Sequence, residues 1–129
     1  MLLIHIDMKV LAVMLGGAVG ALLRYLVSLL CGSYGWVGTA VVNCVGCFVL
    51  GAVVALVIKW QGFGQTTLYM FLSVGLCGSF TTFSTMVKDA SVMGTSGNWL
   101  ISALYVGLSV AIGLVMYRFG DKIVELYIK

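Results

Sequence analysis

The sequence predicts an all-α integral membrane protein with four transmembrane helices. The prediction rests on composition, on four apolar segments of span length, and on tryptophans at their ends. Of the 129 residues, 62% are hydrophobic and 9% are charged, and the mean hydropathy is +1.17. Soluble domains are about 45–50% apolar and about 25% charged, so a water-soluble core of this size cannot hold so much apolar surface. The length allows one domain, which we expect to cover residues 1–129.

Four segments reach the length of about 20 apolar residues that a transmembrane helix requires. They lie at residues 9–31, 37–58, 68–86 or beyond, and 99–116, with continuation of the last to residue 126 left open. Three short connections, rich in glycine, serine and aromatic residues, separate them at residues 32–36, 59–65 and 89–98. Trp36, Trp60 and Trp99 lie at span ends, as in an aromatic belt. The first segment has the wrong flanks for a cleavable signal, so we expect a retained span.

Charge and cysteine content exclude several classes of protein. The net charge of +3 is scattered along the chain, which does not favour nucleic acid as a partner. The lipid bilayer is the expected surrounding, with localisation as a multi-pass protein of the cell membrane. Lys9, Lys59, Lys122 and Lys129 fall on one side and Arg24 and Lys88 on or toward the other, which leans toward both termini in the cytoplasm. We interpret the four cysteines as small packing residues, since most lie within apolar segments.

Polar side chains inside the spans are candidates for a functional interior. Arg24 lies well inside the first span, where a charge costs at least about 2.5 kcal/mol, although the residue is also near enough to the interface to snorkel. Asn43 lies in the middle of the second span and offers two amide donors, or one interhelical hydrogen bond. In the fourth span, Tyr105 needs a partner for its hydroxyl, whereas Ser109 can bond its own backbone.

The third span contains a predicted break. Gly75 and Gly78 weaken the helix, and five hydroxyl side chains between residues 79 and 85 compete for backbone hydrogen bonds. Non-helical backbone survives at membrane depth only where protein or water satisfies it, so a broken span would lie at an interface or line a pathway. The alternative is one continuous helix whose hydroxyls point at neighbouring helices.

Acidic residues are absent between Asp7 and Asp89. A proton-coupled pump or cation carrier normally needs a carboxylate inside the membrane, so a small four-helix multidrug or cation exporter is the less favoured alternative. Arginine, amide and hydroxyl donors beside phenyl rings suit an anion better, although serine and threonine also accept hydrogen bonds. Passive transport needs no acid–base or covalent chemistry, so we do not expect an enzyme. A membrane protein without a selective site explains the hydrophobicity but not this combination of polar residues.

Three segments together resemble the signature regions of the CrcB/Fluc fluoride channels. They read GGAVGALLRY, GTAVVNCVGCFVLG and GLCGSFTTFSTM, and the resemblance covers length, span number and motif order. It implies a passive fluoride-selective channel that exports fluoride from the cytoplasm and lowers its toxicity. It also implies an antiparallel, dual-topology dimer with two pores and a structural sodium ion at the dimer interface.

The resemblance also implies roles for individual residues. Backbone carbonyls of Gly78 and Thr81 would hold the sodium ion. The fluoride pathway would comprise an arginine, an asparagine, a ring and hydroxyl track on the third span, and two residues of the fourth. In this sequence these positions are Arg24, Asn43, Phe83, Ser84, Thr85, Met86, Tyr105 and Ser109.

Met86 departs from the pattern, because members of this family commonly read T-T-F-S-T-F. Methionine has no positive ring edge but is flexible and polarizable, so we expect a working pore with a softer contact. Lys88 is an unusual charge, and Asp89 stands about where the family places a glutamate. We favour a homodimer. The bias of the basic residues toward one side leaves open a heterodimer with a paralogous partner, since the chain of an antiparallel homodimer has to insert in both orientations.

Overall fold

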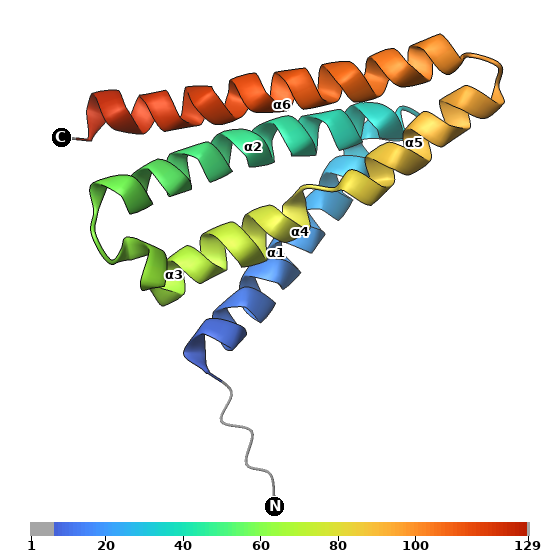
Figure 1. Cartoon of the computed structure of the whole chain (residues 1–129). Coiled ribbons are helices and arrows are strands. Elements are labelled where there is room, and N and C mark those ends of the chain that lie inside the picture. The colour runs from blue at the N-terminus through green and yellow to red at the C-terminus, as the bar shows by residue number, and fades with distance from the viewer. Residues whose placement is uncertain (1–6, 129) are drawn as a thin grey trace, which may run out of the picture.

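Four helical spans make up residues 7–128, the part of the chain that the computed structural model describes (Figure 1). Three are single helices: α1 (Met8–Cys31), α2 (Gly35–Lys59) and α6 (Trp99–Tyr127). The third span, Thr67–Thr95, consists in order of α3 (Thr67–Met70), the π-helix η2 (Phe71–Cys77), α4 (Gly78–Phe80) and α5 (Phe83–Thr95). A 3-10 turn, η1 (Phe63–Gln65), precedes it. Each span is long and apolar enough to cross a membrane, and no strand occurs within these residues, which confirms the fold class.

Most predicted boundaries agree with the structure to within two residues, but the third connection was predicted wrongly. Residues 89–95 are helical, and only 96–98 form the loop. Tertiary contacts outweigh the polar composition here, since Asp89 accepts a hydrogen bond from Thr39 of α2 and the Ala90 carbonyl accepts one from Ser102 of α6. The fourth span takes its longer alternative and ends at Tyr127. Lys129 lies outside the described residues.

Glycines bring α1 into close contact with the first half of the third span. The buried residues of α1 are Ala12, Gly16 and Gly20, one helical turn apart. A side-chain carbon on Gly16 would collide with the Phe71 carbonyl oxygen, and one on Gly20 with the carbonyl oxygen of Leu76. Small residues of this kind let membrane helices approach at backbone distance. The stripe of Ala12, Gly16 and Gly20 is therefore the packing face of α1.

A second glycine seam joins α2 to α6, which run side by side along most of their length (Figure 1). Gly51 of α2 packs on the backbone of Tyr117, and Gly120 of α6 packs on the Phe48 carbonyl. Each helix therefore has a glycine whose missing side chain lets the backbone of the other helix come into contact. These two seams fix α1 and α6 on opposite sides of α2 and the third span, and the region between them is where the polar residues meet.

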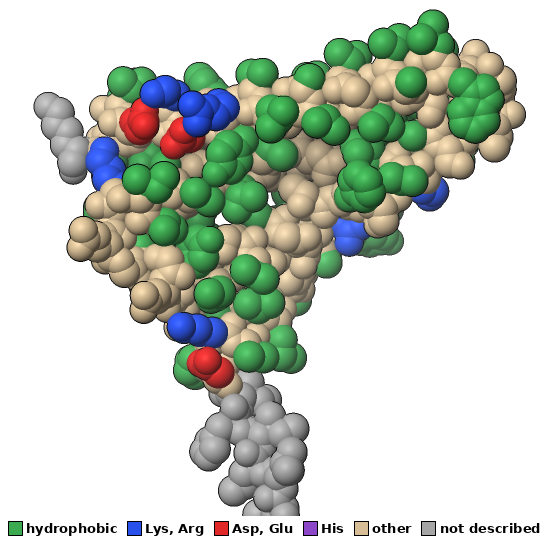
Figure 2. Space-filling view, in the orientation of Figure 1, with side chains coloured by type: hydrophobic (Ala, Val, Ile, Leu, Met, Phe, Trp, Pro, Cys, Tyr) green, Lys and Arg blue, Asp and Glu red, His purple; other side chains and the backbone are tan. Residues whose placement is uncertain are grey.

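Most charged side chains gather at one end of the described chain. Figure 2 shows them over the C-terminal end of α6 and beside the start of α1, with apolar side chains covering the rest of α6 on that face and two further Lys or Arg side chains beside α5. The loops at the opposite end, residues 32–34 and 96–98, contain no charged residue. The asymmetry agrees with the predicted lean of the basic residues toward one membrane surface.

Candidate functional site

The third span breaks at Thr81 and Thr82, as the sequence predicted. Thr81 (φ −78°, ψ 157°) and Thr82 (φ −152°, ψ 114°) are extended, between the end of α4 and the start of α5. The Thr82 hydroxyl accepts a hydrogen bond from the Thr85 amide at 3.1 Å and donates to Thr85 Oγ1 at 2.9 Å. Such a cap supplies an acceptor that the first turn of a helix lacks. Thr81 is the C-cap of α4 and Thr82 is the N-cap of α5, so these two residues separate the helical segments.

Asn43 of α2 holds this break in place. The Thr82 amide donates to Asn43 Oδ1 at 2.7 Å, and Asn43 Nδ2 donates back to the Thr82 carbonyl at 3.1 Å. One side chain thus satisfies both backbone groups of a buried, non-helical residue, which membrane depth requires. The interhelical hydrogen bond considered for Asn43 is present, and it uses one of the two Nδ2 hydrogens.

The same contacts redirect amides that a continuous helix would supply to two carbonyls. In an α-helix the amide of Thr82 would donate to Gly78, and the amide of Thr85 to Thr81. Here the first donates to Asn43 and the second to the Thr82 hydroxyl. The carbonyl oxygens of Gly78 and Thr81 therefore lose their helical donors, which makes them suitable ligands for a hard cation.

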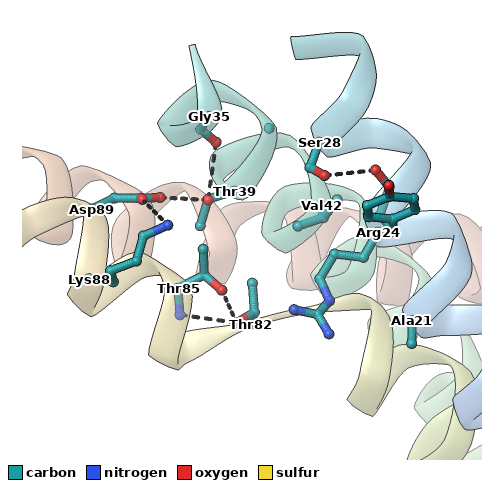
Figure 3. A pocket seen from close by; sticks show the side chains of 12 residues that line it. Ala21, Arg24, Ser28, Gly35, Thr39, Val42, Thr82, Thr85, Lys88 and Asp89 are labelled. Carbon is teal, nitrogen blue, oxygen red and sulfur yellow. Dashed lines mark hydrogen bonds and ion pairs between the residues drawn. The ribbon is translucent and has the colours of Figure 1, made fainter. Parts of the chain in front are cut away.

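Arg24 lies beside the break and lines a hollow of about 330 Å³ between α1, α2 and α5. Its Nε donates to the Ser79 carbonyl at 3.1 Å. We call this space the charged hollow and define it by six of its polar lining residues: Arg24, Thr39, Thr82, Thr85, Lys88 and Asp89. Figure 3 shows the Arg24 side chain reaching from α1 toward Thr82, with Asp89 between Thr39 and Lys88 across the space.

A second hollow of about 440 Å³ lies on the other side of the break, between α2, the third span and α6. We call it the apolar hollow. Its surface is mostly apolar, and its lining includes six of the predicted site residues: Asn43, Gly78, Thr81, Phe83, Met86 and Ser109. The Phe83 side chain is 74% exposed in the single chain. Thr82 lines both hollows, so the break is the partition between them.

Three predicted site residues lie elsewhere or are occupied by other contacts. Tyr105 is buried, stacks edge-on against Trp36 with ring centroids 6.1 Å apart, and donates to the Trp36 carbonyl at 3.4 Å. It lines a third, apolar hollow rather than the two that meet at Thr82. Met86 is buried in a cluster with Tyr105. Ser84 is exposed on α5, with its Oγ 3.4 Å from Thr82 Oγ1.

The predicted site residues did not include Thr82, the most connected polar residue of the site, or Thr39. Thr82 appeared only as one hydroxyl among five, yet its backbone and side chain organise the break. Thr39 donates to Asp89 Oδ2 at 2.6 Å and so links α2 to α5. The spacing of Thr82 and Thr85 is that of a helix cap, a signal that the surrounding apolar residues obscured. Ser109 donates to the Tyr105 carbonyl at 2.7 Å, the bond to its own backbone that the sequence analysis considered.

Comparison with known proteins places these features in a family. Residues 11–121 match the model of the CrcB-like proteins, described as Camphor Resistance (CrcB). Proteins named fluoride-specific ion channel FluC are 37% identical in Shewanella sp. (strain W3-18-1) and 36% identical in Shewanella sp. (strain ANA-3). Each of these alignments covers 90% of this chain and 95% of the relative. The chain therefore belongs to the CrcB-like family of multi-pass membrane proteins.

Proposed function

We propose that the chain is a passive, fluoride-selective ion channel that lets fluoride leave the cytoplasm. Its family membership supports this function, because its relatives are named fluoride-specific ion channels. The observation that carries the proposal is the break at Thr82, which has a hollow with two cations on one side and a hollow with a phenyl ring and an amide on the other. An anion passing this point would meet the donors of Arg24, Thr85 and Asn43, and one carboxylate, that of Asp89.

The proposed pathway matches the chemistry of fluoride, a small anion that holds water tightly. A selective pore must replace that water at close range, and the second Nδ2 hydrogen of Asn43 and the hydroxyl of Thr85 are suitable donors. The positive edge of the Phe83 ring adds an attraction without a full charge, so that the ion can also leave. Arg24 raises the local anion concentration at the entrance. Ser84, Met86, Tyr105 and Ser109 remain proposed members of the pathway.

A dimer is part of this proposal. Phe83 is largely exposed in the single chain, and the apolar hollow is open, so a second subunit would cover both. A two-fold axis beside α4 would bring two copies of the Gly78 and Thr81 carbonyls together. Four carbonyl oxygens suit a sodium ion, and the redirected amides of Thr82 and Thr85 support this assignment. The sodium ion would hold the broken third spans of the two subunits together.

The identity of the second subunit has two candidates. We propose an antiparallel homodimer, the simplest assembly that supplies both copies of the break. The second candidate is a heterodimer with a paralogous chain of opposite orientation. Lys9, Lys59, Arg118 and Lys122 lie at one end, whereas only Arg24 and Lys88 lie toward the other. This bias gives the heterodimer its support, because an antiparallel homodimer requires the chain to insert equally in both orientations.

Reconstitution of the purified chain alone tests the function and the homodimer together. Liposomes loaded with potassium fluoride and potassium chloride are diluted into an osmotically matched buffer of an impermeant potassium-free salt, valinomycin lets potassium follow, and efflux of each anion is recorded with ion-selective electrodes. We expect rapid fluoride loss with little chloride loss and no requirement for a pH gradient. A pH-gradient requirement would support the exporter alternative and contradict the channel. Absence of flux in well-folded dimers would contradict the homodimer and point to the paralogous partner.

A further inference from the structure

The carboxylate of Asp89 is held at the wall of the charged hollow. Its side chain is 10% exposed, and Oδ2 accepts a hydrogen bond from Thr39 Oγ1 at 2.6 Å. The Thr39 hydroxyl is also 3.2 Å from the Gly35 carbonyl, but its single hydrogen is better placed toward the closer, charged acceptor. A negative charge is therefore fixed beside a route that an anion has to use.

Lys88 turns back toward this carboxylate. Its Nζ lies 3.4 Å from Asp89 Oδ1, on the side of the carboxylate that Thr39 leaves open (Figure 3). Adjacent residues do not face each other on a helix, so the helix itself does not impose this pairing. The Lys88 side chain is 70% exposed and has room for other positions. Its placement in the hollow therefore follows from attraction to Asp89.

We propose that Lys88 is a positioning residue for anion conduction. Its ammonium group cancels the charge of Asp89 and so keeps the charged hollow net positive. The charged side chains that line this hollow are Arg24, Lys88 and Asp89. Two cations and one carboxylate leave an excess of one positive charge, and loss of Lys88 leaves none. The inference rests on the proposed function, in which anions pass through the hollow. It concerns the lysine, a charge that the sequence analysis marked as unusual.

A purely structural role for Lys88, such as anchoring α5 at the membrane surface, predicts different behaviour. An anchor acts through folding and orientation, and its loss would change throughput equally at all salt concentrations. An electrostatic role acts through the local concentration of anions and is screened, since the Debye length falls from about 30 Å at 0.01 M to about 3 Å at 1 M salt. Salt dependence therefore separates the two roles.

The first test measures fluoride efflux from liposomes for wild type, Lys88→Gln, Lys88→Arg and the double variant Lys88→Gln/Asp89→Asn. At about 0.02 M ionic strength we expect Lys88→Gln to lower throughput about two- to five-fold, the effect of one charge at roughly 5–10 Å in a polar medium. Lys88→Arg should match wild type, and the double variant should recover. At about 0.5 M the difference should vanish.

The control Lys9→Gln removes the same charge from the far end of α1 and should have no effect. A salt-independent loss, or no loss at low salt, would overturn the proposal.

The second test does not depend on conduction, so it separates failure of this inference from failure of the proposed function. Ser28 lines the charged hollow and is exposed. In a background with the four native cysteines changed to alanine, the thiol introduced by Ser28→Cys is labelled with an anionic and with a cationic methanethiosulfonate reagent. Adding Lys88→Gln should lower the ratio of anionic to cationic labelling rates about two- to five-fold at low salt. An unchanged ratio in protein that elutes normally on size exclusion would contradict the proposal.

Discussion

The two hollows that meet at Thr82 differ in how they treat an anion. The charged hollow is bounded by α1, α2 and α5 and contains two cations and a carboxylate. The apolar hollow is bounded by α2, the third span and α6 and offers an amide, a ring and hydroxyls among aliphatic side chains. In the proposed pathway, attraction at long range would belong to the first hollow and close contact with a dehydrated ion to the second. One broken helix would then separate recruitment of the anion from its selection.

The largest expected effect comes from removing the partition itself. Asn43→Leu keeps the approximate size of the side chain but leaves the buried amide and carbonyl of Thr82 without partners. Each unsatisfied group costs about 1–3 kcal/mol, so we expect a clear loss of stability together with loss of fluoride flux. Denaturation in detergent and liposome efflux measure the two effects. Normal stability and flux in this variant would mean that the two hydrogen bonds from Asn43 to the Thr82 backbone do not hold the break in place.

A smaller effect is expected from the charged hollow. Arg24→Gln removes a cation from the hollow and should lower fluoride throughput about ten-fold at low salt, with much less effect at high salt. Arg24→Lys keeps the charge but not the geometry of the Nε bond to Ser79, so it should retain most of the throughput. Efflux at two ionic strengths is the measurement. Equal losses in both variants would show that Arg24 acts through packing on Ser79 and not through charge.

In the apolar hollow, Phe83→Ile removes a ring edge and keeps an apolar side chain. Aromatic edge interactions are worth about 0.5–1.5 kcal/mol, so fluoride throughput should fall about two- to ten-fold. Unlike the change at Arg24, this loss should be the same at low and high salt, because no formal charge is removed. Efflux together with size-exclusion elution of the dimer measures it. Unchanged throughput would leave Phe83 as a packing residue.

Met86→Phe should change fluoride throughput less than Phe83→Ile does. Met86 is buried beside Ala90 and Tyr105, but it also borders the apolar hollow, which has space for a larger side chain. We expect fluoride efflux within about two-fold of wild type, since volume changes with free space are tolerated. A severe loss of folding, measured by thermal stability in detergent, would mean that Met86 is enclosed more tightly than this hollow indicates.

Ser109→Ala is expected to have the smallest effect. The hydroxyl donates to the Tyr105 carbonyl one turn earlier, and such bonds to the helix backbone contribute little. Efflux of fluoride and chloride should match wild type within experimental error. A loss of selectivity would require the hydroxyl to leave Tyr105 and face the ion, and would extend the selecting region to α6.

The sequence predicted the spans and the break because both depend on local signals. Apolar length identifies a membrane helix, and the glycines and hydroxyls that predict the break all lie within residues 75–85. The clamp between Asn43 and Thr82 was not predictable, because the two residues are 39 positions apart and nothing local pairs them. The helical extension through Asp89 was missed for the same reason, since contacts from Thr39 and Ser102 stabilise a polar stretch.

The central claim, fluoride-selective passive conduction, is tested most directly by the reversal potential under opposing gradients of two anions. The purified chain is fused into a planar bilayer with high fluoride and low chloride on one side and the reverse on the other, at equal pH. The account predicts a current that reverses close to the equilibrium potential of fluoride and that persists without a pH gradient. A reversal potential near zero, or at the equilibrium potential of chloride, would contradict it.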